Sequence, residues 1–310
     1  MSKLYPLLMR PAFRPMVWGG GKLKELFGKP LPSGSIGESW EVACREDLWS
    51  VVDNGFLKGT PLPEVFGKYS TEILGQEGNK FPWLVKLIDA RTDLSVQVHP
   101  DDEYAVSHGD FSGKTEMWHI LQADPGSRLV VGFRQNVTRQ MVEQKASDGS
   151  IVEILNEVAV KQGDTFFIPP GTVHAIGGGI VLLEIQQNSD ATYRLYDWGR
   201  MGTDGKPREL HIQKAADVVS LQKSSPQADS VKVLDNGDQL LANCDFFSVK
   251  KRNVTVESMV EGFAVLISLE GKVKVGTLSL NAGDSVLIPH SVGKVPISGS
   301  GEIVLVEKPD

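Results

Sequence analysis

Short apolar runs, separated by glycine, proline and polar residues, follow one another along most of this 310-residue chain. Each run has only a few residues and is bounded by turn-forming types, which is the pattern of β-strands rather than of long helices. The clearest runs lie at residues 84–88, 129–131, 165–168, 180–183, 264–267 and 302–306. We therefore expect a mainly β protein.

Helical periodicity is confined to a few places. Residues 138–157 predict two short amphipathic helices broken at Asp148-Gly149, and they form the core of a small helical insertion over about residues 133–157. Further helices are expected at residues 62–74 and 214–221.

One pattern occurs twice. Residues 161–169 read KQGDTFFIP and residues 281–289 read NAGDSVLIP, each with a Gly-Asp turn that leads into an apolar strand. A turn, strand, Ile-Pro, loop and strand in this order are typical of a cupin-type jelly roll, so the repeat predicts two such barrels. In register, His174 of the first copy corresponds to Lys294 of the second, so the second barrel is expected to be degenerate.

The polar stretch QKSSPQADS divides the two copies. The expected organisation is a catalytic, metal-binding cupin domain at residues 1–221, a linker at 222–230 and the degenerate second domain at 231–310.

Four polar residues in the first copy predict a metal site. Gln97 and His99 alternate with valines in SVQVHPDD, so they share one face of a strand, while Glu116 begins another strand and His174 follows a Pro-Pro-Gly turn. Two imidazoles, a carboxylate and an amide oxygen suit a borderline divalent metal such as zinc. His119 has the opposite parity to Glu116 and is expected to face away from the site.

Lys114 and Arg194 are cations near the expected mouth of this cavity, and arginine suits phosphate through its planar fork. An ion pair of Arg194 with Glu184 or Asp197 is an equally good interpretation at this stage.

Composition narrows the setting of the protein. A net charge of −7 argues against a surface that binds nucleic acid, and no apolar run is long enough for a membrane span. The two cysteines, Cys44 and Cys244, are far apart, so we expect no disulfide and a cytoplasmic location. A monomer or a homodimer fits equally well.

Several ordered motifs resemble one family, the type I mannose-6-phosphate isomerases in their short bacterial form, over most of the first 215 residues. They are WGG at residue 18, IGESW at 36, FPWLVK at 81, SVQVHPD at 95, KTEM at 114, PPGTVH at 169 and SDATYR at 189. The resemblance implies an enzyme that interconverts mannose 6-phosphate and fructose 6-phosphate through a cis-enediol(ate). It also implies one Zn²⁺ per chain, or another divalent metal, held by Gln97, His99, Glu116 and His174.

The same resemblance implies roles for the remaining polar groups. Arg194, Lys114 and Glu184 would be catalytic, and Ser95 and Lys86 would join Lys114 and Arg194 around the phosphorylated hexose. Glu184 is the expected proton shuttle, with a zinc-bound hydroxide or a histidine as the alternative base.

Lys86 stands within an apolar strand and is expected to have a buried carboxylate partner, for which Glu38 and Glu41 are available. Two other classes of protein stay open, an Fe(II) cupin oxygenase and a non-catalytic sugar-binding cupin.

Overall fold

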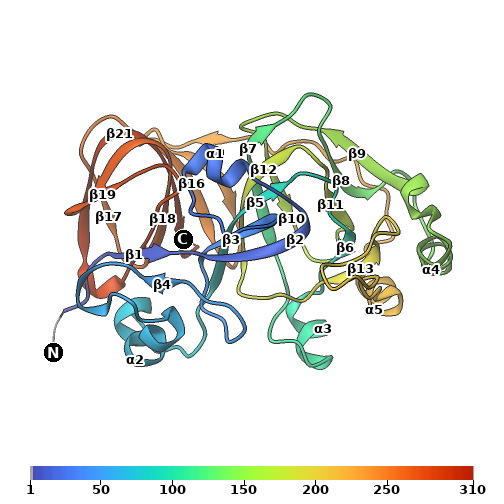
Figure 1. Ribbon diagram of the computed structural model, residues 1–310, viewed down its shortest axis with the longest axis horizontal. Coiled ribbons are helices and arrows are strands. Elements are labelled where there is room, and N and C mark those ends of the chain that lie inside the picture. The colour runs from blue at the N-terminus through green and yellow to red at the C-terminus, as the bar shows by residue number, and fades with distance from the viewer. Residues whose placement is uncertain (1–2, 310) are drawn as a thin grey trace.

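The computed structural model describes residues 3–309, and its strands form three antiparallel sheets (Figure 1). The first sheet has six strands in the order β10 (Thr165–Ile168), β7 (Glu116–Ala123), β12 (Ile180–Gln187), β5 (Trp83–Ala90), β2 (Ala12–Gly20) and β3 (Ile36–Val42). The second has five, β13 (Tyr193–Tyr196), β6 (Val96–Val98), β11 (His174–Ile176), β8 (Arg128–Phe133) and β9 (Leu155–Ala159). The prediction of a mainly β protein is confirmed.

These two sheets pack face to face. Their shared core includes Ile88 and Trp118 from the six-stranded sheet and Leu129, Val131 and Ile176 from the five-stranded one. Alternation along each strand puts apolar side chains into this core, and it brings polar residues of the same faces together at one end of the space between the sheets.

The third sheet has ten strands and gathers the C-terminal part of the chain. Its main path is β14 (Lys232–Val233), β15 (Gln239–Asn243), β16 (Ser248–Val254), β21 (Lys294–Glu307), β18 (Ala264–Val275), β20 (Ser285–Ile288), β1 (Leu7–Arg10) and β4 (Val51–Val52). Two further strands, β17 (Ser258–Glu261) and β19 (Leu278–Leu280), pair with β21 and β18. The N-terminal strand β1 thus pairs with β20, with Leu7 opposite Leu287.

The repeated sequence pattern corresponds to a repeated turn. Gly163 and Gly283 have φ of 90° and 86°, a conformation in which glycine is not strained. One carboxylate oxygen of Asp164 accepts the amide of Lys161 at 2.9 Å, and one of Asp284 accepts the amide of Asn281 at 2.8 Å. Each turn leads into a short strand, β10 or β20, as the repeat predicted.

The helices are short and lie outside the sheets. The helix predicted at 62–74 is α2 (Leu62–Leu74), and the two predicted in the insertion are α4 (Arg139–Asp148) and the 3-10 helix η2 (Ser150–Ile154), separated at Gly149. The others are α1 (Lys22–Phe27), α3 (Asp102–Ser107), α5 (Ile212–Val218), η1 (Gly55–Leu57) and η3 (His290–Val292).

Two helix predictions need correction. The helical segment is shorter than 133–157, because Phe133 ends β8 and residues 155–159 form β9. The helix expected at 214–221 instead ends at Val218, since the amide of Ser220 bonds to the carbonyl of Gly171 at 2.7 Å. That bond draws the chain out of the helix toward the turn that precedes His174.

The segment at 222–230 lies along the first two sheets. Its Ser224 amide bonds to the carbonyl of Phe133, and Asp229 bonds to the backbone of Thr165 and Phe167 in β10. Cys44 and Cys244 are both free thiols. Within residues 3–309, no helix has the length and apolar character that crossing a membrane requires.

Candidate active site

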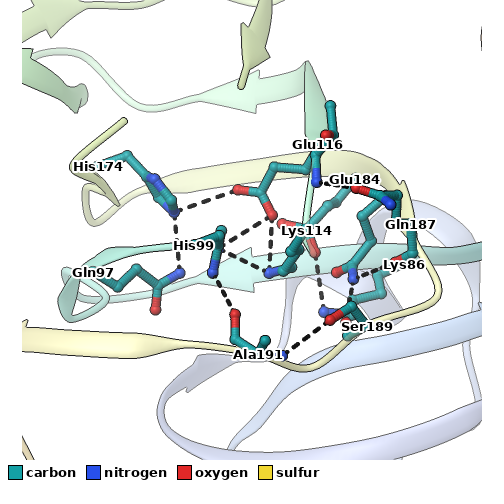
Figure 2. A network of polar contacts seen from close by, with 12 residues as sticks. Lys86, Gln97, His99, Lys114, Glu116, His174, Glu184, Gln187, Ser189 and Ala191 are labelled. Atoms are coloured by element: carbon teal, nitrogen blue, oxygen red, sulfur yellow. Dashed lines mark hydrogen bonds and ion pairs between the residues drawn. The ribbon is translucent and has the colours of Figure 1, made fainter. Parts of the chain in front are cut away.

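His99, Glu116 and His174 form a buried cluster at one end of the space between the first two sheets (Figure 2). Nε2 of His99 lies 3.5 Å from Oε2 of Glu116, and Nε2 of His174 lies 3.4 Å from Oε1 of the same carboxylate. β7 supplies Glu116 and β11 supplies His174, while His99 directly follows β6. His174 follows the Pro-Pro-Gly turn noted in the sequence and is the first residue of β11.

Backbone carbonyls orient both imidazoles. Nδ1 of His99 lies 2.7 Å from the carbonyl oxygen of Ala191, and Nδ1 of His174 lies 2.8 Å from that of Thr172. With Nδ1–H donating to these carbonyls, each Nε2 lone pair is directed at Glu116. Burial lowers the pKa of His174 to about 3, and burial together with the charge of Lys114 lowers the pKa of His99. Both rings are therefore neutral near pH 7.

Glu116 is ionised although it is fully buried. Burial alone would raise its pKa, but the positive charge of Lys114 holds the pKa well below its usual value. Nζ of Lys114 lies 2.9 Å from Oε2 of Glu116 and 3.1 Å from Nε2 of His99. Within residues 3–309 neither oxygen of Glu116 accepts a well-aligned hydrogen bond. The anionic carboxylate and the two neutral imidazole nitrogens are directed at one another, and they are suitable ligand atoms for a divalent metal ion.

Gln97 lies beside this cluster, directly across from His174 in the pairing of β6 with β11. Its amide nitrogen is 3.3 Å from Nε2 of His174, and its amide oxygen accepts a hydrogen bond of 3.4 Å from the hydroxyl of Ser95. The nitrogen rather than the oxygen of this amide therefore faces the cluster. That Gln97 supplies a ligand oxygen stays a prediction.

A cavity of about 360 Å³ opens next to the cluster, and the other predicted site residues line it. They are Lys86, Ser95, Gln97, Lys114, Glu184 and Arg194. The cluster itself lies behind Lys114 and Gln97, with His99, Glu116 and His174 at most 1% exposed.

Arg194 has no carboxylate partner in the described part of the chain. Its Nε donates to the hydroxyl of Ser95 at 3.2 Å and one terminal nitrogen donates to the carbonyl of Glu209. Asp197 binds Arg200 and Arg208 instead. Burial and the nearby charge of Arg208 lower the pKa of Arg194. The ion-pair interpretation of Arg194 is therefore wrong, and its guanidinium is available to an anion.

Lys86 does have a buried carboxylate partner, but the predicted partner was wrong. Its Nζ is 3.0 Å from Oε1 of Glu184, because these residues lie directly opposite each other on β5 and β12. The second oxygen of Glu184 accepts the indole N–H of Trp118 at 2.9 Å. Of the two carboxylates proposed earlier, Glu41 instead pairs with Lys29, and Glu38 accepts the indole N–H of Trp40.

Seven further residues with charged or imidazole side chains line the cavity and were not predicted there from the sequence: Arg14, Glu38, Asp110, Asp190, Arg208, His211 and Lys214. Asp190 stands inside the motif SDATYR, so its position beside Arg194 was a usable signal. Arg14 had none, because its contact of 3.2 Å with Asp190 joins residues 176 positions apart in the sequence.

Facing antiparallel sheets, a His-Glu-His cluster and an adjoining cavity rich in cations define a cupin-type protein with a candidate metal centre. Residues 7–124 match the family described as phosphomannose isomerase type I, catalytic domain. Residues 238–308 match the mannose-6-phosphate isomerase cupin domain. The chain belongs to the type I phosphomannose isomerase family.

Full-length relatives support this assignment. The chain is 38% identical to mannose-6-phosphate isomerase ManA of Bacillus subtilis (strain 168), over 97% of this chain and 98% of the relative. It is 35% identical to mannose-6-phosphate isomerase of Streptococcus mutans, over 96% and 97% of the two chains. The crystal structure of mannose 6-phosphate isomerase from Bacillus subtilis superposes with a TM-score of 0.89 at 32% identity, covering 98% of this chain and all of that one.

Proposed function

We propose that this chain is a metal-dependent aldose–ketose isomerase that interconverts mannose 6-phosphate and fructose 6-phosphate. The observation that carries the proposal is the buried His99–Glu116–His174 cluster beside a cavity into which Arg194 offers an uncompensated guanidinium. The phosphate of a sugar phosphate would then bind to Arg194, and the carbonyl end of the sugar would lie near the cluster. Relatives of nearly the same length carry this activity in their names, which supports the same assignment here.

The metal would be one Zn²⁺ per chain, held by His99, Glu116 and His174, with Gln97 as a fourth ligand if its amide turns over. Neutral imidazoles and an ionised carboxylate are the protonation states that zinc requires. When bound, the metal would supply Lewis-acid polarisation of the sugar carbonyl. The bound metal would also neutralise the negative charge of Glu116. The ammonium of Lys114 would then be released from this carboxylate toward the cavity, which it already lines.

The reaction moves one proton between C2 and C1 of the open-chain sugar. A base takes the proton from C2, the electron pair forms the C1–C2 double bond, and the carbonyl oxygen at C1 becomes an enediol(ate) oxygen. The hydroxyl proton on O2 then passes to O1, the carbonyl forms at C2, and the double-bond electrons take a proton at C1. Glu184 is the proposed base, because Lys86 and the indole of Trp118 fix its two oxygens at the cavity wall. Lys114 and Arg194 would stabilise the negative charge that develops on the enediolate and hold the phosphate. Ser95 keeps Arg194 in place through the hydrogen bond to its Nε.

A coupled assay tests the activity. Mannose 6-phosphate is supplied to the metal-loaded protein and fructose 6-phosphate is measured, with glucose 6-phosphate and free mannose as comparison substrates. We expect turnover of mannose 6-phosphate that falls at least about a hundredfold in Glu116→Gln. No turnover in a folded, metal-loaded sample would overturn the isomerase and favour the oxygenase or the binding protein.

We further propose two cupin-type jelly rolls, with catalytic residues 1–221, a linker at 222–230 and a degenerate second barrel at 231–310. The repeated Gly-Asp turns support this division, with β1 and β4 as strands that the N-terminal part contributes to the C-terminal sheet. A cytoplasmic location is proposed from the two free thiols.

A further inference from the structure

A second cavity, of about 320 Å³, lies on the opposite side of β7 from the candidate active site. Ligand pockets are typically of about 300 to 1,000 Å³ and occur preferentially between packed units. This one is bounded by β7 of the six-stranded sheet and by β16, β18 and β21 of the ten-stranded sheet. Figure 1 shows α1 lying over this junction, and the last two residues of α1, Leu26 and Phe27, form part of the cavity wall.

His119 is the central polar group of this cavity. It is 3% exposed, and its Nδ1 lies 2.9 Å from the hydroxyl of Thr165 on β10. Its Nε2 makes no hydrogen bond within residues 3–309, so this nitrogen is free to bond to a ligand in the cavity. Burial, with a smaller effect of Lys251, lowers the pKa of His119 to about 4, so the ring is neutral near pH 7.

The charged groups of this cavity are of both signs, with one ammonium and two carboxylates. Nζ of Lys251 is 3.1 Å from Oε2 of Glu302, which leaves further N–H donors and a second carboxylate oxygen for a ligand. Glu270 stands opposite Glu302 at the exposed rim. An anionic ligand would meet two carboxylates here, and a cationic one would meet the ammonium of Lys251. A neutral ligand with several hydroxyl groups would be repelled neither by the carboxylates nor by the ammonium.

The apolar part of the wall suits the C–H faces of such a ligand. Leu26, Phe27, Leu121 and Leu269 surround the polar groups, so the cavity offers mixed donors and acceptors above an apolar floor. We propose that this cavity binds an uncharged polyhydroxy compound, such as a hexose or hexitol, with hydrogen bonds to His119, Lys251 and Glu302. The site is separate from the active-site cavity and does not depend on the proposed function.

The test is binding of D-mannitol, an uncharged hexitol without a carbonyl group, to the full-length, metal-loaded protein. Calorimetry measures affinity, and hydrogen exchange locates the ligand. We expect a Kd on the order of 1 mM. We also expect slower exchange in peptides that contain Ile120 and Gly163, and no change in peptides that contain Gln97 and His99.

Variants decide whether the named residues carry the binding. His119→Phe and Lys251→Met should each weaken the affinity at least about tenfold. Lys272→Met, which removes an exposed lysine of β18 that does not line the cavity, should leave the affinity unchanged. Lys251→Met keeps the test valid if His119→Phe does not fold.

Three results would overturn the proposal. The first is that mannitol does not bind. The second is that it slows hydrogen exchange only in peptides of the active-site cavity, and the third is that both His119→Phe and Lys251→Met bind it with unchanged affinity. Sulfate or methylammonium serves as a charged probe, and tighter binding of either at the same peptides would overturn the assigned ligand class. Loss of isomerase activity alone would bear on the proposed function and not on this site.

Discussion

At the scale of single residues, the candidate active site depends on charged groups that are buried in pairs. The side chains of Lys86 and Glu184 are each 4% exposed, and Lys114 and Glu116 are 4% and 0% exposed. A buried charge loses its hydration, so each member of such a pair is tolerable only because its partner is close. Burial alone would lower the pKa of Lys86, yet the charge of Glu184 raises it above its ordinary value.

Lys86→Met should therefore lower the free energy of unfolding by about 3 to 5 kcal/mol, because it leaves Glu184 buried without a partner. The double variant Lys86→Met/Glu184→Gln removes both charges and should recover part of that loss. Urea unfolding measures all three proteins, with Lys161→Met at an exposed position as the matched control. A double variant that is no more stable than Lys86→Met would contradict this account.

Sequence alternation predicted which residues point inward but not always which residues they meet. It separated Glu116 from His119 correctly, because parity on a strand is a local property. The partner of Lys86 was missed because the pairing of β5 with β12 depends on strand register between segments nearly a hundred residues apart. Register of this kind is set by packing of the whole sheet and leaves no local signal.

At the scale of elements, β7 contributes one face to the active-site cavity and the other face to the second cavity. Glu116 and Trp118 point toward the active-site cavity and contact its polar groups, whereas His119 points toward the ten-stranded sheet. The buried position of His119 has a consequence for stability in acid. Its pKa in the folded protein is lowered from 6.5 to about 4, so at intermediate pH the unfolded chain binds a proton that the folded chain does not.

Stability should therefore fall as the pH drops from 6.5 toward 4, and His119 should account for about 3 kcal/mol of that loss. His119→Gln cannot take up the proton, so its free energy of unfolding should fall by that much less over the same range. Urea unfolding at a series of pH values measures the difference. Exposed His108, changed to Gln, is the control; equal pH dependence of the wild type and His119→Gln would refute the prediction.

Helix α2 was predicted with its observed bounds, because its apolar periodicity and its ending glycine, Gly75, are both local signals. The end of α5 was not predictable in the same way. Val219 leaves the helix because the next residue, Ser220, bonds to Gly171, and that contact exists only in the folded protein. Elements defined by their own pattern were predicted, and those cut short by a distant contact were not.

At the scale of the whole molecule, the two ends of the chain share one sheet. β1 pairs with β20 on one side and with β4 on the other, so strands from the N-terminal part extend a sheet whose other strands lie beyond residue 230 (Figure 1). The repeat in the sequence predicted two similar modules, but nothing in it indicated this exchange. Leu7 is fully buried in the core that both parts of the chain form.

Leu7→Ala should lower the free energy of unfolding by about 2 to 5 kcal/mol, because it leaves a cavity where both parts of the chain meet. It should also speed hydrogen exchange in residues 285–288, which β1 covers. Leu210→Ala, at a position 39% exposed, is the control and should change stability by about 0.5 kcal/mol or less. Unchanged exchange in β20 would show that β1 does not support the C-terminal sheet.

The metal role is tested most directly by a zinc titration of the chelator-treated, metal-free protein. Bound zinc and mannose 6-phosphate turnover are both measured at each zinc concentration. We expect turnover to be absent without metal, to rise in proportion to bound zinc and to level off at one zinc per chain. The Glu116→Gln variant should bind zinc at least about tenfold more weakly at the same pH. Full turnover in a folded, metal-free sample, or zinc bound with no gain in turnover, would contradict the proposed role of the metal.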